Sequence, residues 1–304
     1  MSDLPFLAHG ETYRRLDQMR LAGRLPHALI FLGPEGVGKQ LVARHLAKAL
    51  LCEKESSAPC GACRSCQQAA AGQHPDLWSL EPDGGRIKID AIRELKKSLS
   101  LPPLVSKVRA VLIAEAHALN AAAANALLKT LEEPPPATYF LLASHAAGWV
   151  PRTILSRCQK VRFSPLPDPA LAEILRAQGK ALDPRRLRLA QGSARLALLL
   201  SEAPEEWPNL ERLGGDAEPL GLDEAYALGQ SLNEAERLTP YLESLLLEAH
   251  RRLCAESSAE RRFALLTFAE RILEFRREMR QNANPKLHLP RLLMFFKEPL
   301  ESRL

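Results

Sequence analysis

A glycine-rich segment near the N-terminus has the residue types of a phosphate-binding loop. Residues 33–40 read Gly-Pro-Glu-Gly-Val-Gly-Lys-Gln and fit the pattern G-x-x-x-x-G-K, between an apolar run and a helical stretch. Glycines in such a loop let backbone N–H groups converge on phosphate oxygens, and the helix N-terminus adds favourable partial charge. The lysine of such a loop reaches the terminal phosphates. Candidate nucleotide-binding residues are therefore Gly33, Gly36, Gly38 and Lys39.

The residues that should hold magnesium are changed at two positions. A hydrolysing loop ends in Ser or Thr, whose hydroxyl coordinates Mg²⁺, but this chain has Gln40, whose amide is a poor replacement. The apolar run at 110–113 should be followed by an Asp that holds the metal and a Glu that activates water. Here Ala114 takes the place of the Asp, and only Glu115 remains. The sequence therefore predicts no hydrolysis and no Mg²⁺ in this site, and leaves ATP binding in doubt.

A group of cysteines follows the helix after the loop. Cys60, Cys63 and Cys66 are spaced C-x-x-C-x-x-C, and Cys52 precedes them. In a reducing compartment, thiolates at this spacing favour a tetrahedral structural Zn²⁺ site, with redox-active thiols or an iron–sulfur cluster as alternatives. His74 is near enough in sequence to compete as a ligand, although a turn before the next strand also explains it. With every zinc position taken by a cysteine, no catalysis is expected there.

The elements that position these residues can be read from the apolar pattern. Short apolar runs bounded by Gly, Pro or polar residues alternate with helical stretches, which predicts an α/β domain with a parallel five-stranded sheet. The expected strands are residues 28–32, 77–80, 110–113, 139–143 and 160–163. The expected helices between them are residues 39–51, 89–99 and 121–131.

The rest of the chain has a helical pattern. Prolines 165, 167 and 169 punctuate it, and a polar stretch rich in Pro and Gly at 203–221 has the composition of a linker. We therefore expect residues 1–165 to form the phosphate-loop domain, with the cysteine module inserted at 52–66. Residues 166–205 would form a small helical lid, and residues 206–304 an all-α domain.

Several longer motifs closely resemble the AAA+ clamp-loader family of the bacterial DNA polymerase III holoenzyme, which is a nucleotidyltransferase. They are residues 125–135, which read NALLKTLEEPP, residues 140–144, and residues 154–158, which include Ser-Arg-Cys. The resemblance covers about the first 200 residues, and residues 282–287 resemble the last domain of the family more loosely. It implies a zinc module at the position of the cysteines and a C-terminal collar that holds subunits in a ring.

The resemblance also implies roles for three further residues. Arg157 would act in trans as an arginine finger, which stabilises charge on the phosphoryl group of a neighbouring subunit. A surface arginine with a structural role is the alternative. Arg195 matches an arginine with which working members sense nucleotide from the lid, or is a solvated helix residue. Ser144 stands at the polar sensor position, or simply ends its strand.

A function follows from the resemblance together with the changed magnesium site. The chain would be a non-hydrolysing (stator) subunit of the complex that loads a sliding clamp (beta) onto primed DNA during replication. The implied partners are gamma/tau motor subunits and a delta subunit in a hetero-pentameric ring. The alternative is an active AAA+ ATPase motor of a clamp or helicase loader, which would need magnesium ligands at positions 40 and 114.

Composition limits the remaining possibilities. Apolar residues make up 46% and charged residues 25% of the 304 residues, and the net charge is +5. The basic residues are scattered, so we expect at most phosphate contacts with DNA and no sequence reading. The sequence has no apolar run long enough for a membrane span and no export signal in residues 1–10, which predicts a cytoplasmic protein.

Overall fold

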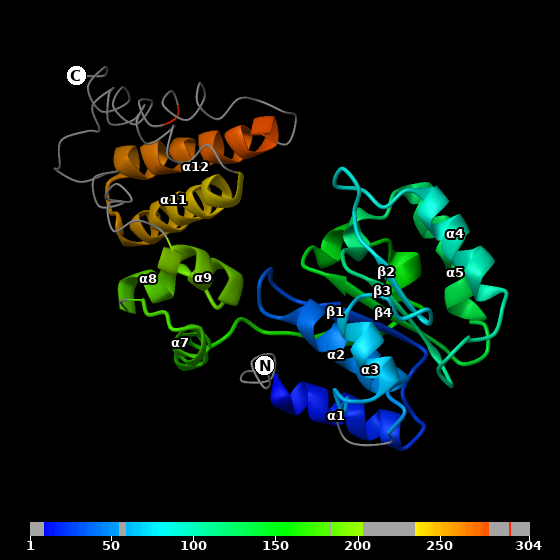
Figure 1. Ribbon diagram of the computed structural model, residues 1–304. Coiled ribbons are helices and arrows are strands. Elements are labelled where there is room, and N and C mark those ends of the chain that lie inside the picture. Colours follow the sequence, from blue (N-terminus) through cyan, green and yellow to red (C-terminus); the bar gives the residue numbers. More distant parts are fainter. Residues whose placement is uncertain (1–8, 55–58, 183, 203–234, 280–291, 293–304) are drawn as a thin grey trace. The chain divides into compact units, whose positions relative to one another are not determined.

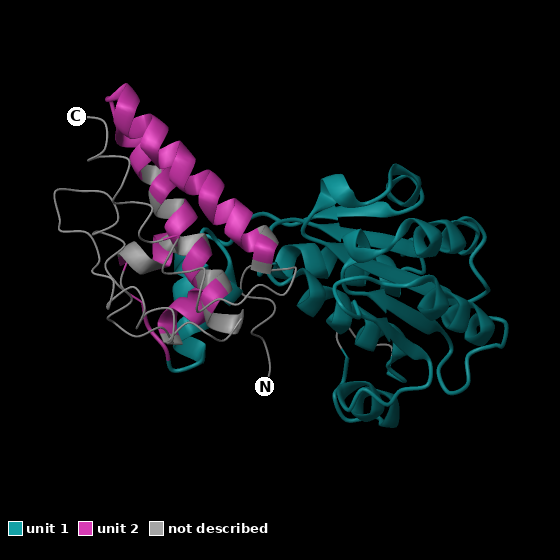
Figure 2. Cartoon of the chain, turned by 90° about the horizontal axis from the view of Figure 1, so that it is seen from above, with its two compact units in different colours: residues 1–179, 191–195 teal, residues 180–190, 196–304 magenta. Residues whose placement is uncertain are grey.

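The computed structural model describes residues 9–54, 59–182, 184–202, 235–279 and 292. These residues group into two compact units, which Figure 2 colours separately: residues 1–179 with 191–195, and residues 180–190 with 196–304. The expected linker at 203–221 and the family-like segment at 282–287 lie outside the described residues. The division into three domains at 165 and 205 stays a prediction.

The first unit contains a parallel five-stranded sheet in the order β2-β3-β4-β1-β5 (Figure 1). This confirms the predicted α/β fold. The three central strands are mostly apolar because helices cover both faces of the sheet, whereas the edge strand at residues 159–162 is mostly polar and exposed. Their bounds are Ala28–Leu32 (β1), Leu77–Leu80 (β2), Arg109–Ile113 (β3), Thr138–Ser144 (β4) and Gln159–Arg162 (β5).

The strand order brings distant parts of the sequence to one edge of the sheet. Strand β4 lies between β1 and β3, with Leu32 opposite Ser144 and Ile113 opposite Leu142. The phosphate loop follows β1, and Ala114 follows β3. Because all strands are parallel, these segments meet at their carboxyl ends, where open α/β sheets bind ligands.

Helices cover both faces of the sheet. Helix α2 (Lys39–Leu51) contacts β1, β3 and β4 on one face, and α1 (Gly10–Leu21) packs beside it. Helices α4 (Ile89–Leu99) and α5 (Ala121–Glu132) pack together on the other face, as Figure 1 shows. The remaining helices of this unit are α3 (Arg64–Ala70), α6 (Arg152–Leu155) and α7 (Asp168–Ala177), with short 3-10 turns η2 (Ala116–Ala118) and η3 (Ala147–Trp149).

Successive side chains of a strand point to opposite faces of the sheet, and in β1 the residues on both faces are buried. Ala28 and Ile30 of β1 join one hydrophobic cluster with Leu95 of α4 and Leu127 of α5. Leu29 and Phe31, which alternate with them and are equally buried, must point to the face that α2 covers. The phosphate loop therefore extends from a strand that is fixed on both sides.

The second unit is helical in its described part. It contains α8 (Pro184–Leu189), most of α9 (Ala194–Glu202), α11 (Ala235–Ala255) and α12 (Ala259–Met279). Helices α11 and α12 pack along each other and bury Tyr241, Leu245, Phe268 and Ile272. Both helices lie in the stretch for which the sequence predicts a helical pattern.

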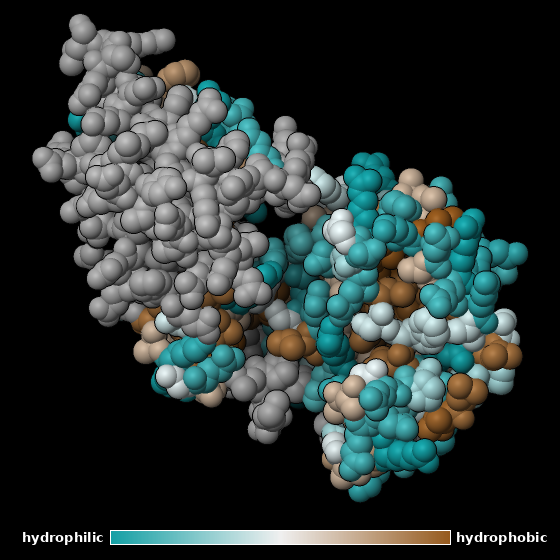
Figure 3. All heavy atoms as spheres, turned by 45° about the horizontal axis from the view of Figure 1, so that its top comes forward, coloured by the Kyte–Doolittle hydropathy of each residue, from teal (hydrophilic) through white to brown (hydrophobic). Residues whose placement is uncertain are grey.

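The described surface is mixed in character. On the face shown in Figure 3, hydrophilic residues cover much of the first unit, with small groups of hydrophobic residues between them. Among the described helices, none combines the length and apolar character needed to span a membrane.

Candidate nucleotide and metal sites

The phosphate loop connects β1 to α2 through glycines whose backbone conformation favours glycine. Gly38 is the N-cap of α2 with φ of 97°, and Gly36 has φ of 76°. Both angles lie in the left-handed region, where a side chain is strained. A Cβ at Gly36 would also lie 2.0 Å from the Ser193 hydroxyl oxygen. These glycines are therefore required by the folded chain itself, with or without a nucleotide.

Lys39 is turned into its own loop. Its side chain is almost completely buried, and Nζ donates a hydrogen bond to the carbonyl oxygen of Pro34. Burial lowers the pKa of Lys39 to about 8, although the nearby Glu35 carboxylate opposes the shift. A phosphate would have to draw this ammonium group away from Pro34 before Lys39 could contact it.

Gln40 and Ala114 are in direct contact. Gln40 Nε2 donates a hydrogen bond of 3.1 Å to the carbonyl oxygen of Ala114, which joins the first turn of α2 to the residue after β3. The amide nitrogen is a donor and has no lone pair to offer a cation. Mg²⁺ prefers oxygen ligands in octahedral geometry. A neutral pair bonded to each other thus stands where a hydrolysing site places a hydroxyl and a carboxylate.

Ser144 and Glu115 meet at a histidine to which the sequence assigned no role. His117 Nδ1 lies 3.2 Å from the Ser144 hydroxyl, and His117 Nε2 lies 3.6 Å from Glu115 Oε2. The Ser144 oxygen also accepts the Ala146 N–H at 3.2 Å. Burial, and then the adjacent His145 ring, lower the pKa of His117. The predicted sensor and general base are thus brought together, with His117 bridging them.

Arg195 pairs with the phosphate loop itself. Its Nη1 lies 2.6 Å from Glu35 Oε1, and both side chains are more than half exposed. The Gly36 carbonyl oxygen accepts the backbone N–H groups of Ala194, at 3.0 Å, and Arg195, at 3.4 Å. The start of α9 therefore rests on the loop through main-chain bonds, and the Arg195 guanidinium is engaged by a carboxylate.

Arg157 lies in the turn between α6 and β5. Its Nε donates to Glu132 Oε1 at 2.7 Å, and its Nη2 donates to the same oxygen. Its Nη1 donates to the Thr153 carbonyl at 2.8 Å and to the Ser156 hydroxyl at 3.3 Å. The sequence identified Arg157 as a candidate but gave no sign that Glu132 is its partner.

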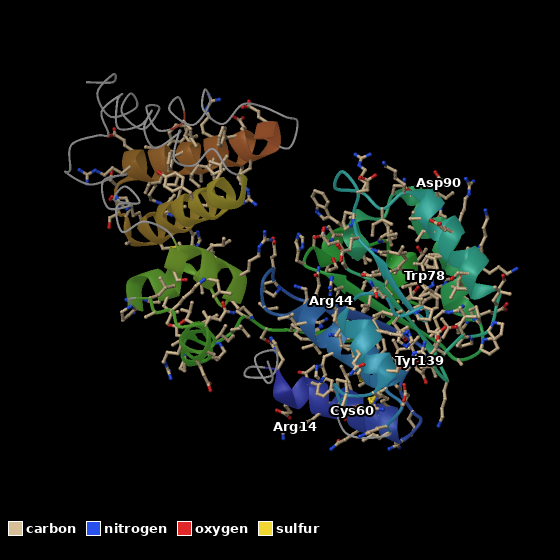
Figure 4. All side chains as sticks on the ribbon, in the orientation of Figure 1. Arg14, Arg44, Cys60, Trp78, Asp90 and Tyr139 are labelled. Atoms are coloured by element: carbon tan, nitrogen blue, oxygen red, sulfur yellow. The ribbon has the colours of Figure 1, made fainter. Side chains whose placement is uncertain are left out.

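The predicted cysteine ligands form one cluster. The sulfur atoms of Cys52, Cys60, Cys63 and Cys66 all lie within 4.8 Å of one another, near the labelled Cys60 in Figure 4. Cys52 ends α2, Cys63 caps α3 and Cys66 lies in its first turn. These four cysteines could hold a metal ion, and His74 is not part of the group.

The donor set fits a tetrahedral metal ion. Thiolates at a Zn–S distance of about 2.3 Å are about 3.8 Å apart in a tetrahedron, and the Cys60 and Cys66 sulfurs are 4.0 Å apart. Backbone N–H groups of Ala62 and Cys63 lower the pKa of Cys60 to about 6, which favours the thiolate that a metal binds. The cluster therefore has the geometry and part of the charge stabilisation of a metal site.

A buried polar network connects the cysteine module to the loop before β3. His74 Nε2 lies 3.1 Å from the hydroxyls of both Ser65, in α3, and Ser106. Its Nδ1 accepts the Asp76 N–H at 3.0 Å, which makes Nε2 the protonated nitrogen. Asp76 in turn accepts backbone N–H groups at 2.7–2.8 Å from Leu104, Val105 and Ser106. His74 is thus a brace between α3 and the loop before β3.

Asp76→Asn should destabilise the first unit by about 2–5 kcal/mol, because the buried amide would turn an N–H donor toward backbone N–H groups that now donate to Asp76. Burial raises the pKa of Asp76, but the three backbone hydrogen bonds outweigh it and hold the pKa below its usual value. The contribution of Asp76 should therefore be present above a pH of about 3.9 and be lost as the pH falls through the lowered pKa. Denaturant unfolding at several pH values would measure both effects. The exposed Asp83→Asn should behave like the unmodified chain, and equal stability of the two variants would contradict the role of Asp76.

The fold and the loop define a class of protein: an α/β phosphate-loop domain of the AAA+ type, followed by helical segments. A crystal structure of a DNA polymerase III gamma subunit-related protein from Thermotoga maritima aligns with a TM-score of 0.52. The alignment covers 95% of this chain and 98% of that chain at 19% sequence identity. At this identity the likeness shows the fold alone.

Sequence comparisons identify the family. The family model described as "DNA polymerase III, delta subunit" matches residues 8–167. The chain is 34% identical over 242 residues to the DNA polymerase III subunit delta' of Escherichia coli K12, which covers 76% of this chain and 72% of that subunit. It is 35% identical over 253 residues to the delta' subunit of Yersinia pestis, with coverages of 78% and 74%. The chain therefore belongs to the delta' family of DNA polymerase III clamp-loader subunits.

Another kind of relative aligns over a shorter region. The tau subunit of Escherichia coli K12 is 40% identical over 189 residues, which are 59% of this chain. The alignment spans only 29% of the length of that subunit. Function must therefore be argued from the site.

Proposed function

We propose that this chain is a non-hydrolysing (stator) subunit of a clamp-loader complex that loads a sliding clamp onto primed DNA. The contact between Gln40 and Ala114 carries the proposal, because these two residues stand at the magnesium-ligand positions and neither side chain offers a hydroxyl or a carboxylate. The similarity to tau, at 40% identity, is the observation that favours an active motor. The changed magnesium ligands, and the hydrogen bond that holds Lys39 on the Pro34 carbonyl, favour a stator subunit.

The names of the relatives suggest the partners. Matches to delta', tau and gamma subunits support a complex in which this chain adjoins gamma/tau motors and a delta subunit in a hetero-pentameric ring. The chain would contact the sliding clamp through the complex, and primed DNA without sequence specificity. In this proposal residues 166–205 form a lid and residues 206–304 a collar. The protein would act in the cytoplasm.

Nucleotide binding by the loop would be weak at best. Three polar groups of the loop already have partners within the chain. Lys39 donates a hydrogen bond to Pro34, Glu35 forms an ion pair with Arg195, and the Gly36 carbonyl accepts hydrogen bonds from residues 194 and 195. A polyphosphate would have to displace the first of these contacts, and Glu35 adds a negative charge beside it. Without metal to offset charge on the phosphates, little binding free energy would remain.

The proposal is tested by the ATPase activity of the purified chain. With Mg²⁺ and saturating ATP, turnover should not exceed that of a Lys39→Ala variant, because neither has a competent magnesium site. The Lys39→Ala chain controls for a contaminating ATPase, whose activity it would leave unchanged. Turnover that disappears in Lys39→Ala would identify the chain as a motor.

We also propose that the four cysteines hold one structural Zn²⁺. Thiolate sulfurs suit zinc, and the spacing of the sulfurs fits a tetrahedral ion. All four ligand positions would come from the protein, so no position is open for water or substrate. The role of the ion would be to order residues 52–66.

A further inference from the structure

We propose that Glu132 is a latch that holds the Arg157 guanidinium in a parked position until the polyphosphate of a neighbouring subunit displaces it. This inference rests on the proposed stator function, in which Arg157 would act in trans as the finger that the family resemblance implies. In this scheme Glu132 is a positioning residue: it does not touch the nucleotide, and it acts only through Arg157.

The hydrogen bonds of Arg157 hold its guanidinium against residues of its own chain. An arginine has five N–H groups, and Glu132 Oε1 accepts two of them, from Nε and Nη2. The Thr153 carbonyl and the Ser156 hydroxyl accept from Nη1. Within the described residues this leaves one N–H group without an acceptor. A bidentate contact with a phosphate needs two free N–H groups. Arg157 therefore cannot make this contact while its guanidinium is bound to Glu132.

The backbone on both sides of the pair is fixed by the core. Ile154 and Cys158 flank Arg157 and are buried in the hydrophobic cluster of the α4 and α5 face. Leu131, directly before Glu132, is buried in the same cluster. The spacing between carboxylate and guanidinium is therefore set by packed residues, and release needs only a change of side-chain rotamers.

The balance of charge favours exchange over a permanent pair. The Glu132 and Arg157 side chains are 47% and 29% exposed, and ion pairs at such sites are weak because water screens them. A bound triphosphate carries several negative charges, against one on Glu132, and therefore attracts the guanidinium more strongly. The latch would hold while no nucleotide-bearing neighbour is docked and yield when one is present.

The test compares variants in the assembled complex by single-turnover ATP hydrolysis, and turnover here means the rate of the phase that Arg157→Ala removes. Glu132→Gln should raise turnover by about two- to fivefold, the range that exposed ion pairs support. Glu132→Asp, which keeps the charge but is shorter, should raise it as well. Glu133→Gln removes an adjacent exposed carboxylate and serves as the matched control, with turnover unchanged.

A double variant separates the latch from a structural effect. In Glu132→Gln/Arg157→Ala, turnover should equal that of Arg157→Ala alone, because the latch acts only through the arginine. If Glu132→Gln leaves turnover unchanged or lowers it while Arg157→Ala lowers it, the latch is overturned and the finger stands. If Arg157→Ala has no effect, the finger itself fails. A rise in turnover that persists in the double variant also overturns the latch.

Discussion

Arg157→Ala in the assembled complex should slow ATP hydrolysis at the adjoining motor site by about a thousandfold or more. The guanidinium would stabilise charge that develops on the transferred phosphoryl group, and alanine cannot replace it. In the proposed ring, other motor sites would be served by arginines of other subunits, so total steady-state turnover would understate the loss. A single-turnover experiment resolves it: the fast phase should lose the amplitude of one site.

Arg152→Ala is the matched control for this experiment. Arg152 is an exposed arginine at the start of α6, the helix just before Arg157, and its removal changes the net charge equally. The complex with Arg152→Ala should keep the full amplitude of the fast phase. The finger would be refuted by a full fast phase in Arg157→Ala, or by an equal loss in both variants. Unchanged thermal unfolding of both variants would exclude a folding defect, since both side chains are on the surface.

The sheet could be predicted closely from the sequence, because its central strands are buried on both faces. Residues 28–32 form a continuous apolar run that ends at the loop glycine, so both the strand and its boundary are readable. Strand β5 was harder to bound: its residues are Gln159, Lys160, Val161 and Arg162, and it pairs only with β1. The prediction placed it one residue too late because apolar Phe163, which follows the strand, is buried.

The contacts within the sites could not be predicted, because they depend on the order of the strands. Gln40 and Ala114 were identified separately as changed magnesium ligands, but nothing in the sequence indicates that they bond to each other. They meet because β4 alone separates β1 from β3. The Glu132–Arg157 pair likewise joins the end of α5 to the turn after α6. Motifs therefore identified which residues matter, whereas topology determined what each one contacts.

The cysteine cluster could be predicted from the sequence, because its four residues are close together in the chain and do not depend on the strand order. Its support could not: Asp76 and the hydroxyl of Ser106 lie outside the motif and belong to a network that only the folded chain forms. His74, considered as a competing ligand, is used by that network. The cysteine cluster and a buried polar network are thus adjacent and share α3, which couples the module to the sheet.

Removal of the metal should therefore destabilise the whole first unit as well as residues 52–66. In isolated zinc-finger peptides about 10–16 kcal/mol of binding free energy drives folding. If a third of that is coupled to this unit, its Tm should fall by roughly 10 °C. Dialysis against a chelator, followed by thermal unfolding and elemental analysis, would measure the loss. We expect one zinc ion per chain before dialysis and none after it.

Cys66→Ser should reproduce the effect of the chelator, because Cys66 is the buried ligand and a serine hydroxyl binds zinc poorly. Cys254→Ser is its matched control: this cysteine is exposed on α11, outside the cluster, and its replacement should leave both the zinc content and the Tm unchanged. Chelator should lower the Tm of Cys254→Ser but have no further effect on Cys66→Ser. A purified chain without zinc, or a Cys66→Ser variant as stable as the control, would show that the four thiols are held together by packing and the His74 network rather than by a metal.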